Sequence, residues 1–137
     1  MINEIKQAIV NELAQLYTGY TIYDEDIPQN FKTPSFLITL IDQDYNKRIN
    51  TKFRSSISFD IAYFSNKDVT EIRNDCYDIQ IQLFREFDLI GEYRVLNKQA
   101  VITDKVLHFT CDINYSEIMD EAYIKMMQSE IIERTEV

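Results

Sequence analysis

The stretch TKFRSSISFDIAYF, residues 51–64, constrains the fold more than any other part of the chain. Side chains of a strand point alternately to its two faces, so a strict alternation of apolar and polar residues predicts a long strand that is buried on one face only. Here one face carries Phe53, Ile57, Phe59, Ile61 and Tyr63, and the other carries Lys52, Arg54, Ser56, Ser58 and Asp60. Other apolar elements must therefore cover one face of a sheet.

Two segments with helical periodicity could provide that cover. Apolar residues recur at intervals of three and four, the spacing of one helix face, in two series: Ile2, Ile5, Ile9, Leu13 and Leu16, and Val69, Ile72, Cys76, Ile79, Leu83 and Phe87. The first helix should end at Gly19. The second should span roughly residues 67–87, with Ser65 or Asn66 as its cap.

The rest of the chain reads mainly as strands. We expect strands at 20–24 and 35–45, a polar turn NKRINT that forms a hairpin with the alternating strand, a small hairpin around Asn97 and Lys98, and a strand at 105–115. The run from Phe36 to Ile41 is nearly all apolar, which predicts cover on both faces there. Residues 24–34, with Pro28 and Pro34, should be irregular.

This order, a helix, three strands, a helix and three strands, predicts an α+β fold. Two helices would pack on a mainly antiparallel sheet as an α/β sandwich. Residues 1–120 should form a single domain, and residues 121–137 a C-terminal tail or arm of that domain. The periodicity of this tail is mixed, so helix, strand and arm all stay open.

Net charge and composition exclude several classes of function. The chain carries a net charge of −9, which disfavours gripping DNA or an anionic membrane. No apolar run approaches the roughly 20 residues of a membrane span, so no membrane association is expected. The N-terminus lacks the pattern of a signal peptide, and two cysteines do not form a disulfide framework. We expect a protein that acts in a reducing interior.

The stretch VITDKVLHFTCDINY, residues 101–115, gathers the only histidine with a cysteine and two aspartates. If it is a strand, Cys111 points inward, whereas His108 and Asp112 share the outer face about 13 Å apart, too far for an acid–base pair. His108 is then predicted to be a polar surface residue. Cys76 and Cys111 are predicted to be core residues.

No motif predicts catalysis or a cofactor. Two glycines in total cannot form a Gly-rich phosphate loop, and one histidine supplies too few ligands for a typical metal site. The acidic run at 24–26 and the pair Asp42 and Asp44 could belong to a calcium site or a glycosidase, but a solvated face is favoured. We predict a protein that is not an enzyme, with no catalytic residue, metal or cofactor.

Charge is distributed unevenly along the chain. Lys47, Arg48, Lys52 and Arg54 cluster at the expected hairpin tip, whereas residues 117–137 carry six acids and two bases. These could be a solvated tip and a solvated tail. They could instead favour head-to-tail self-association, which closes into a ring when the rotation allows it.

As a whole the sequence resembles the tail terminator proteins of phages and phage-like particles with long tails. The similarity rests on IPQNFKTPSFLI, FDIAYF and ITDKVLHF, and it covers nearly the whole chain. It implies a non-enzymatic ring, usually a hexamer, that caps the head-proximal end of the tail tube, stops its growth and offers a surface to the head connector. The partners would be other copies of the chain, the tube protein and a neck protein, with DNA passing through without specific binding. The location would be the host cytoplasm during assembly and then the particle tail.

Two segments are the candidate contacts, the hairpin from Asp42 to Arg54 and the tail from Met126. The candidate residues are Tyr45, Asn46, Lys47, Arg48, Ile49, Lys52, Arg54, Met126, Met127, Ile131 and Ile132. Two alternatives stay open: another neck or connector protein, and a small non-catalytic binding or regulatory domain.

Overall fold

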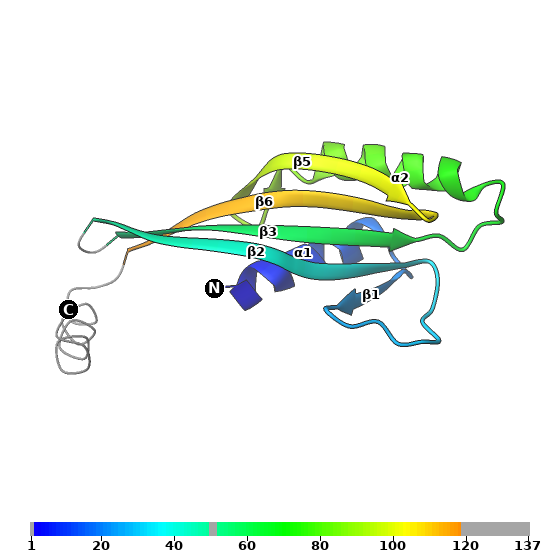
Figure 1. Ribbon diagram of the computed structural model, residues 1–137, viewed down its shortest axis with the longest axis horizontal. Helices are drawn as coiled ribbons and strands as arrows, with labels where there is room; N and C mark the ends of the chain where they lie inside the picture. Colours follow the sequence, from blue (N-terminus) through cyan, green and yellow to red (C-terminus); the bar gives the residue numbers. More distant parts are fainter. Residues whose placement is uncertain (1, 50–51, 119–137) are drawn as a thin grey trace.

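Two helices and six strands follow one another in the predicted order (Figure 1). The computed structural model describes residues 2–49 and 52–118, with the backbone alone for 44–49, 52–55 and 116–118. The elements are α1 (Ile2–Leu16), β1 (Thr21–Asp24), β2 (Ser35–Ile49), β3 (Lys52–Phe64), α2 (Ile72–Glu86), β4 (Leu89–Ile90), β5 (Tyr93–Thr103) and β6 (Val106–Ile118).

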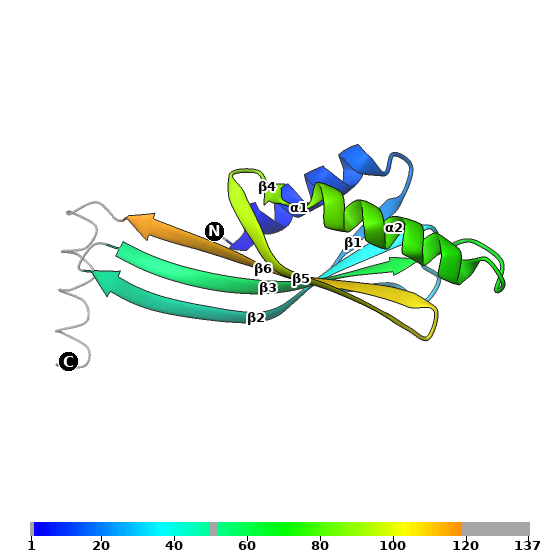
Figure 2. The ribbon, with the colours of Figure 1, turned by 90° about the horizontal axis from the view of Figure 1, so that it is seen from above.

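The strands form one sheet in the order β1-β2-β3-β6-β5-β4. β1 runs parallel to β2, and every other neighbouring pair is antiparallel. Both helices lie on the same face of this sheet (Figure 2). The predicted α+β fold, two helices on a mainly antiparallel sheet, is confirmed.

The core lies between that face and the helices. The inner positions of β3 and β6 alternate as predicted, and with the helix stripes they bury Ile5, Ile9, Leu13, Ile57, Phe59, Ile61, Tyr63, Cys76, Ile79, Leu83, Leu107, Phe109, Cys111 and Ile113. Phe109 meets Phe84 and Phe87 edge to face, with ring centroids 5.3 and 6.0 Å away. Removing this apolar surface from water is the main term that stabilises the fold.

The start of α2 was predicted too early. The helix begins at Ile72 with Glu71 as its N-cap, and Val69 is 68% exposed instead of joining the apolar stripe. Neither Ser65 nor Asn66 caps the helix, because Glu71 occupies the N-cap position. The Ser65 hydroxyl instead donates to the carboxylate of Asp75 in the first turn of α2. The buried Tyr63 donates to the same carboxylate at 2.6 Å. These two hydroxyls tie the helix start to the end of β3.

The predicted hairpin around Asn97 and Lys98 is wrong. β5 is one strand, with a register shift against β6 between Leu96 and Gln99, and Asn97 has a φ of 53° at this irregularity. Asparagine tolerates positive φ in a bulge as well as in a turn, so local sequence does not separate the two. The chain reverses at Asp104 and Lys105, whose φ values are 50° and 64°.

β2 also departs from prediction. It continues to Ile49 through most of the expected polar turn. Its start is not covered on both faces, because Leu37 is only half-buried and Ile41 is 55% exposed. Both helices pack on the other face, so the outward residues of β2 have no helix above them.

Candidate assembly surface

One end of the sheet projects beyond both helices (Figures 1 and 2). It consists of the far parts of β2, β3 and β6. β2 pairs with β3 as far as Ile49 and Lys52, and β6 pairs with β3 as far as Ile118 opposite Lys52. Three strands therefore run side by side to the tip, which gives this end an extended backbone surface.

β2 has a long edge without a neighbouring strand. β1 pairs only with Ser35–Ile38, and within the described part of the chain no strand pairs with the rest of β2 on that side. A register shift between Leu40 and Asp42 leaves Ile41 as an extra residue. Irregularities of this kind discourage indiscriminate pairing of an edge, but the backbone beyond Asp42 stays suited to strand addition.

An ionic cluster marks where this edge begins. Glu25 Oε1 accepts the backbone N–H of Leu40 at 3.0 Å, and Lys6 Nζ lies 2.9 Å from Glu25 and 3.1 Å from Asp24. The hydrogen bond from Lys6, together with that from the Leu40 amide, holds the pKa of Glu25 below its ordinary value. The acidic run at 24–26, expected to be a solvated face, thus supplies two carboxylates that fasten α1 to the sheet edge.

The sheet face opposite the helices carries a row of polar side chains. Asp112 accepts hydrogen bonds from Ser58 Oγ at 2.6 Å and from Asn97 Nδ2 at 2.8 Å. These bonds join β3, β6 and β5 across the open face. Nowhere in 35–43, 56–64 and 106–115, the parts of β2, β3 and β6 with described side chains, is there a lysine or arginine. Apart from His108, the ionisable side chains of these ranges on the open face are carboxylates.

His108 lies on this open face, as the strand geometry predicted, but it has a partner that sequence reasoning missed. Its Nδ1 lies 3.0 Å from Asp60 Oδ2, on the neighbouring strand. The alternation had placed Asp60 on the polar face, but only the register of β3 against β6 brings it to His108.

These polar groups form two separate pairs. Ser58 donates to Asp112, and His108 is bound to Asp60, so neither the serine nor a cysteine meets the histidine in the part of the chain described. The Oδ1 atom of Asp60 is buried without a hydrogen-bond partner there. Nucleophilic catalysis needs a nucleophile within hydrogen-bond reach of its base, and this arrangement does not supply one.

Both cysteines are buried in the core, as predicted. Burial raises the pKa of the Cys111 thiol to about 12, and burial also raises that of Cys76. The thiolate is the nucleophilic and metal-binding form of cysteine, so both side chains serve as small apolar groups. No group of three or more histidine, cysteine, aspartate or glutamate side chains that could hold a metal ion occurs among the described residues.

The structure describes part of the hairpin segment and none of the segment from Met126. The projecting hairpin holds the backbone of Tyr45, Asn46, Lys47, Arg48 and Ile49 at the end of β2, and that of Lys52 and Arg54 at the start of β3. Their side chains, and all of Met126, Met127, Ile131 and Ile132, lie outside what is described. These residues stay predictions.

Comparison with known proteins identifies the family. The model of a family described as "Phage tail terminator protein" matches residues 4–125. The chain belongs to this phage tail terminator family. The family match covers every described helix and strand except the first two residues of α1, so the resemblance found in the sequence is confirmed.

The other comparisons add no functional information. None of the curated proteins compared with the chain matches it significantly. A solved structure without a functional name aligns with 88% of this chain and 96% of its own, at 12% identity and a TM-score of 0.35. A likeness that weak carries no argument about fold or function.

Membership gives this chain a structural role in a phage tail, in association with tail and head components. A place in the virion tail follows from the same membership. Neither helix in the described part of the chain is long and apolar enough to cross a membrane.

Proposed function

We propose that this chain is the subunit of a ring, which we expect to be a hexamer, at the head-proximal end of the tail tube. The ring stops tube polymerisation and presents a surface to the head connector. Subunits gather in the host cytoplasm and stay in the finished tail of a phage or phage-like particle. The observation that carries this proposal is the family match across residues 4–125.

The projecting end of the sheet supports a role in assembly. An exposed strand edge offers regularly spaced N–H and C=O groups that a strand of another subunit can pair with. The edge of β2 beyond Asp42 meets this requirement, and it lies where neither helix covers the sheet (Figures 1 and 2). Ring subunits or tube subunits are the partners that we propose for it.

The charge of the protein supports passage of DNA through the ring without specific binding. Proteins that hold DNA neutralise phosphates with lysine and arginine. This chain has a net charge of −9, and the described side chains of β2, β3 and β6 include neither residue. A surface of this kind repels phosphate, so a duplex is free to slide past it. We further propose that the protein is not an enzyme, in keeping with its structural family.

Deletion of the gene in the particle that encodes it tests the proposal directly. Without a cap the tubes should keep growing, so electron microscopy should show overlong or irregular tails that lack heads. The wild-type gene supplied in trans should restore uniform, head-bearing tails. Uniform tails without heads would instead assign the chain to the neck or connector, and normal particles would contradict a role in assembly.

The hairpin segment is tested by reversing its charge. The double variant Lys47→Glu with Arg48→Glu should reduce ring formation, measured as oligomer mass by light scattering or as tail length after complementation. Lys67→Glu is the matched control, because Lys67 is exposed and lies beyond the opposite end of β3. A double variant that caps tails as well as the control does would remove the hairpin tip from the interface.

Truncation tests the tail segment. A chain that ends at residue 125 keeps the whole family match but loses Met126, Met127, Ile131 and Ile132. We expect weaker ring formation from it. Unchanged oligomer mass and normal tail length would rule this segment out as a contact.

A further inference from the structure

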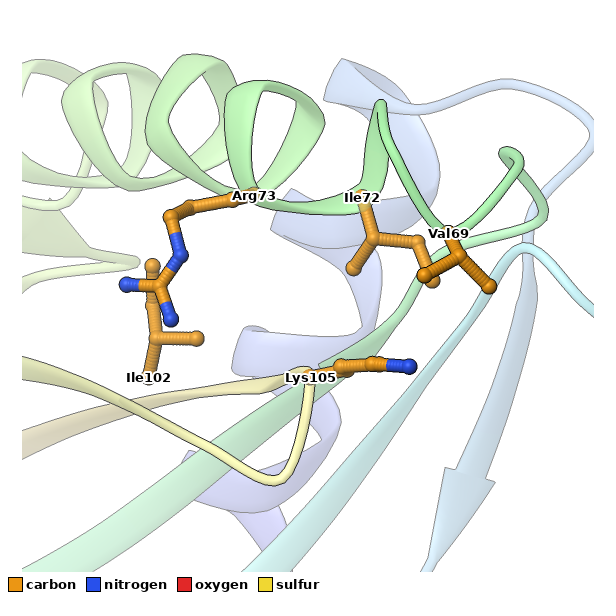
Figure 3. Close-up of a pocket in the computed structure, with 5 residues that line it drawn as sticks. All are labelled: Val69, Ile72, Arg73, Ile102 and Lys105. Carbon is orange, nitrogen blue, oxygen red and sulfur yellow. The ribbon is translucent and has the colours of Figure 1, made fainter.

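The start of α2 and the β5–β6 turn lie at the end of the molecule opposite the projecting hairpin (Figure 1), and a small hollow lies between them (Figure 3). It measures about 100 Å³ and is lined by Val69, Ile72, Arg73, Ile102 and Lys105. Val69 lies in the turn before α2 and Ile72 is the first residue of α2, whereas Ile102 lies near the end of β5 and Lys105 in the β5–β6 turn. Cavities that hold small molecules usually measure roughly 300–1,000 Å³, so this one fits an apolar side chain better than a cofactor.

The two charged residues that line the hollow, Arg73 and Lys105, are both basic. Arg73 extends from α2 toward Ile102, and Lys105 runs past Ile72 and Val69 (Figure 3). Within the described residues neither cation has a hydrogen bond or an ion pair, although the chain as a whole is strongly acidic. Both charges are thus available to a partner that carries carboxylates beside an apolar group.

Both cations occupy positions that local physics disfavours. Arg73 is the second residue of α2, where the helix dipole favours a negative charge. Lys105 has a φ of 64°, in the left-handed region where a residue with a Cβ is strained and glycine is the usual choice. Val69, next to them, is 68% exposed. Local costs of this kind concentrate at functional sites.

We propose that this hollow receives the C-terminal segment of a second copy of the chain, with Ile131 or Ile132 in the hollow and Glu130 and Glu133 beside Arg73 and Lys105. The segment SEIIE, residues 129–133, places two isoleucines between two carboxylates. This apolar and acidic pattern complements the apolar lining and the two cations. The inference rests on the proposed function, because it names a contact through which ring subunits join.

The position of the chain end favours a second copy over the same molecule. β6 begins beside the hollow, at Val106, and ends at Ile118, roughly 40 Å away at 3.3 Å per residue. Only 13 residues lie between Ile118 and Ile132. They would have to retrace that whole distance almost fully extended, whereas a neighbouring copy has no such restriction.

Binding of a labelled peptide to the full-length protein tests this contact. The probe is MMQSEIIERTEV, residues 126–137, and the readout is fluorescence anisotropy. Arg73→Glu and Lys105→Glu should each weaken binding by roughly fivefold or more, since reversing one charge turns an attraction into a repulsion. Arg73→Glu also suits the helix dipole, so the variant should fold. Arg85→Glu, exposed on the last turn of the same helix, is the matched control and should bind like wild type.

Charge exchange makes the test specific. A peptide with Glu130→Lys and Glu133→Lys should bind poorly to the wild type and regain affinity for the protein that carries both Arg73→Glu and Lys105→Glu. Equal binding of the original peptide by wild type and both variants, or no binding to wild type, would overturn the inference.

Cysteine cross-linking separates a second copy from the same chain. Mixing a Val69→Cys protein with an Ile132→Cys protein should give a covalent dimer, and Leu89→Cys, also exposed, should not replace Val69→Cys. A chain that carries both new cysteines and cross-links only within itself would overturn the assignment to a second copy. The proposed function is judged separately by tail length: normal capping without peptide binding refutes only this contact, and peptide binding with normal tails in the deletion refutes only the capping role.

Discussion

The link between β3 and α2 provides the sharpest test of how the structure is held together. Tyr63 is only 1% exposed, and its hydroxyl donates to Asp75 Oδ2 at 2.6 Å. Burial is the main cause that raises the pKa of Tyr63, and the hydrogen bond to Asp75 raises it further. The hydroxyl therefore stays a donor at any physiological pH. Ser65 donates to the same carboxylate oxygen. Asp75 therefore joins the end of the long strand to the first turn of the helix.

The contribution of this link to the free energy of unfolding follows from the groups that it joins. Tyr63→Phe removes a hydrogen bond to a charged group, and we expect a loss of about 1–2 kcal/mol because Ser65 still serves the carboxylate. Asp75→Ala leaves the Tyr63 hydroxyl without its acceptor and removes a favourable charge from the helix start, so about 2–3 kcal/mol should be lost. Once Asp75 is absent, Tyr63→Phe should cost less than about 0.5 kcal/mol.

Urea unfolding of the wild type, both single variants and the double variant measures this coupling. The free energies of unfolding should show an interaction of about 1–2 kcal/mol between the two sites. Tyr77→Phe is the control, because Tyr77 lies on the same helix but is 43% exposed, and its stability should not change. If Tyr63→Phe costs the same with and without Asp75, the hydroxyl–carboxylate bond does not hold α2 to β3.

Three further predictions concern other parts of the fold. Lys6 and the Leu40 amide lower the pKa of Glu25, so its contribution is present above its unfolded pKa of about 4 and is lost as the pH falls through the folded value. The stability difference between wild type and Glu25→Gln should thus be larger at pH 7 than at pH 3, and urea midpoints that differ equally at both would contradict this. Cys111, with its pKa raised to about 12 by burial, should react with a thiol reagent at pH 8 only after unfolding; fast labelling of the native protein would show that the thiol is accessible. Phe109→Ala should cost about 3–5 kcal/mol, because the ring is fully buried against two other rings, and a urea midpoint near that of wild type would mean that the core collapses around the gap.

Local periodicity accounts for the elements that the sequence predicted well. α1 has the predicted stripe of Ile5, Ile9 and Leu13 in the core, and β3 and β6 bury the predicted faces. A helix repeats every 3.6 residues and a strand every two, so the spacing of apolar residues in a long amphipathic segment indicates which of the two it forms. The errors fell where a residue type has more than one use, as with Asn97 in a bulge and Ser65 bonded to Asp75.

The candidate surface was less predictable than the core. The sequence placed a charged hairpin near residues 46–51, but how far the hairpin projects depends on where the two helices lie on the sheet. The hollow at the other end joins the start of α2 to the β5–β6 turn, segments about 30 residues apart. No periodicity relates such distant segments. The exposed Val69, and Arg73 and Lys105 without an ion-pair partner among the described residues, became recognisable only in the folded chain.

The sequence alone determined the kinds of elements, their order, their inward faces and the family. The spacing of apolar residues indicates the elements and their inward faces, and the overall pattern of residues indicates the family. Tertiary structure decided which side chains meet. Strand register brought Asp60 to His108, and chain packing brought Lys6 to Glu25 and Asp75 to Tyr63. The packing of the whole core sets how strands pair and where helices dock. A slip of one residue between β3 and β6 would separate Asp60 from His108, although the sequence would be the same.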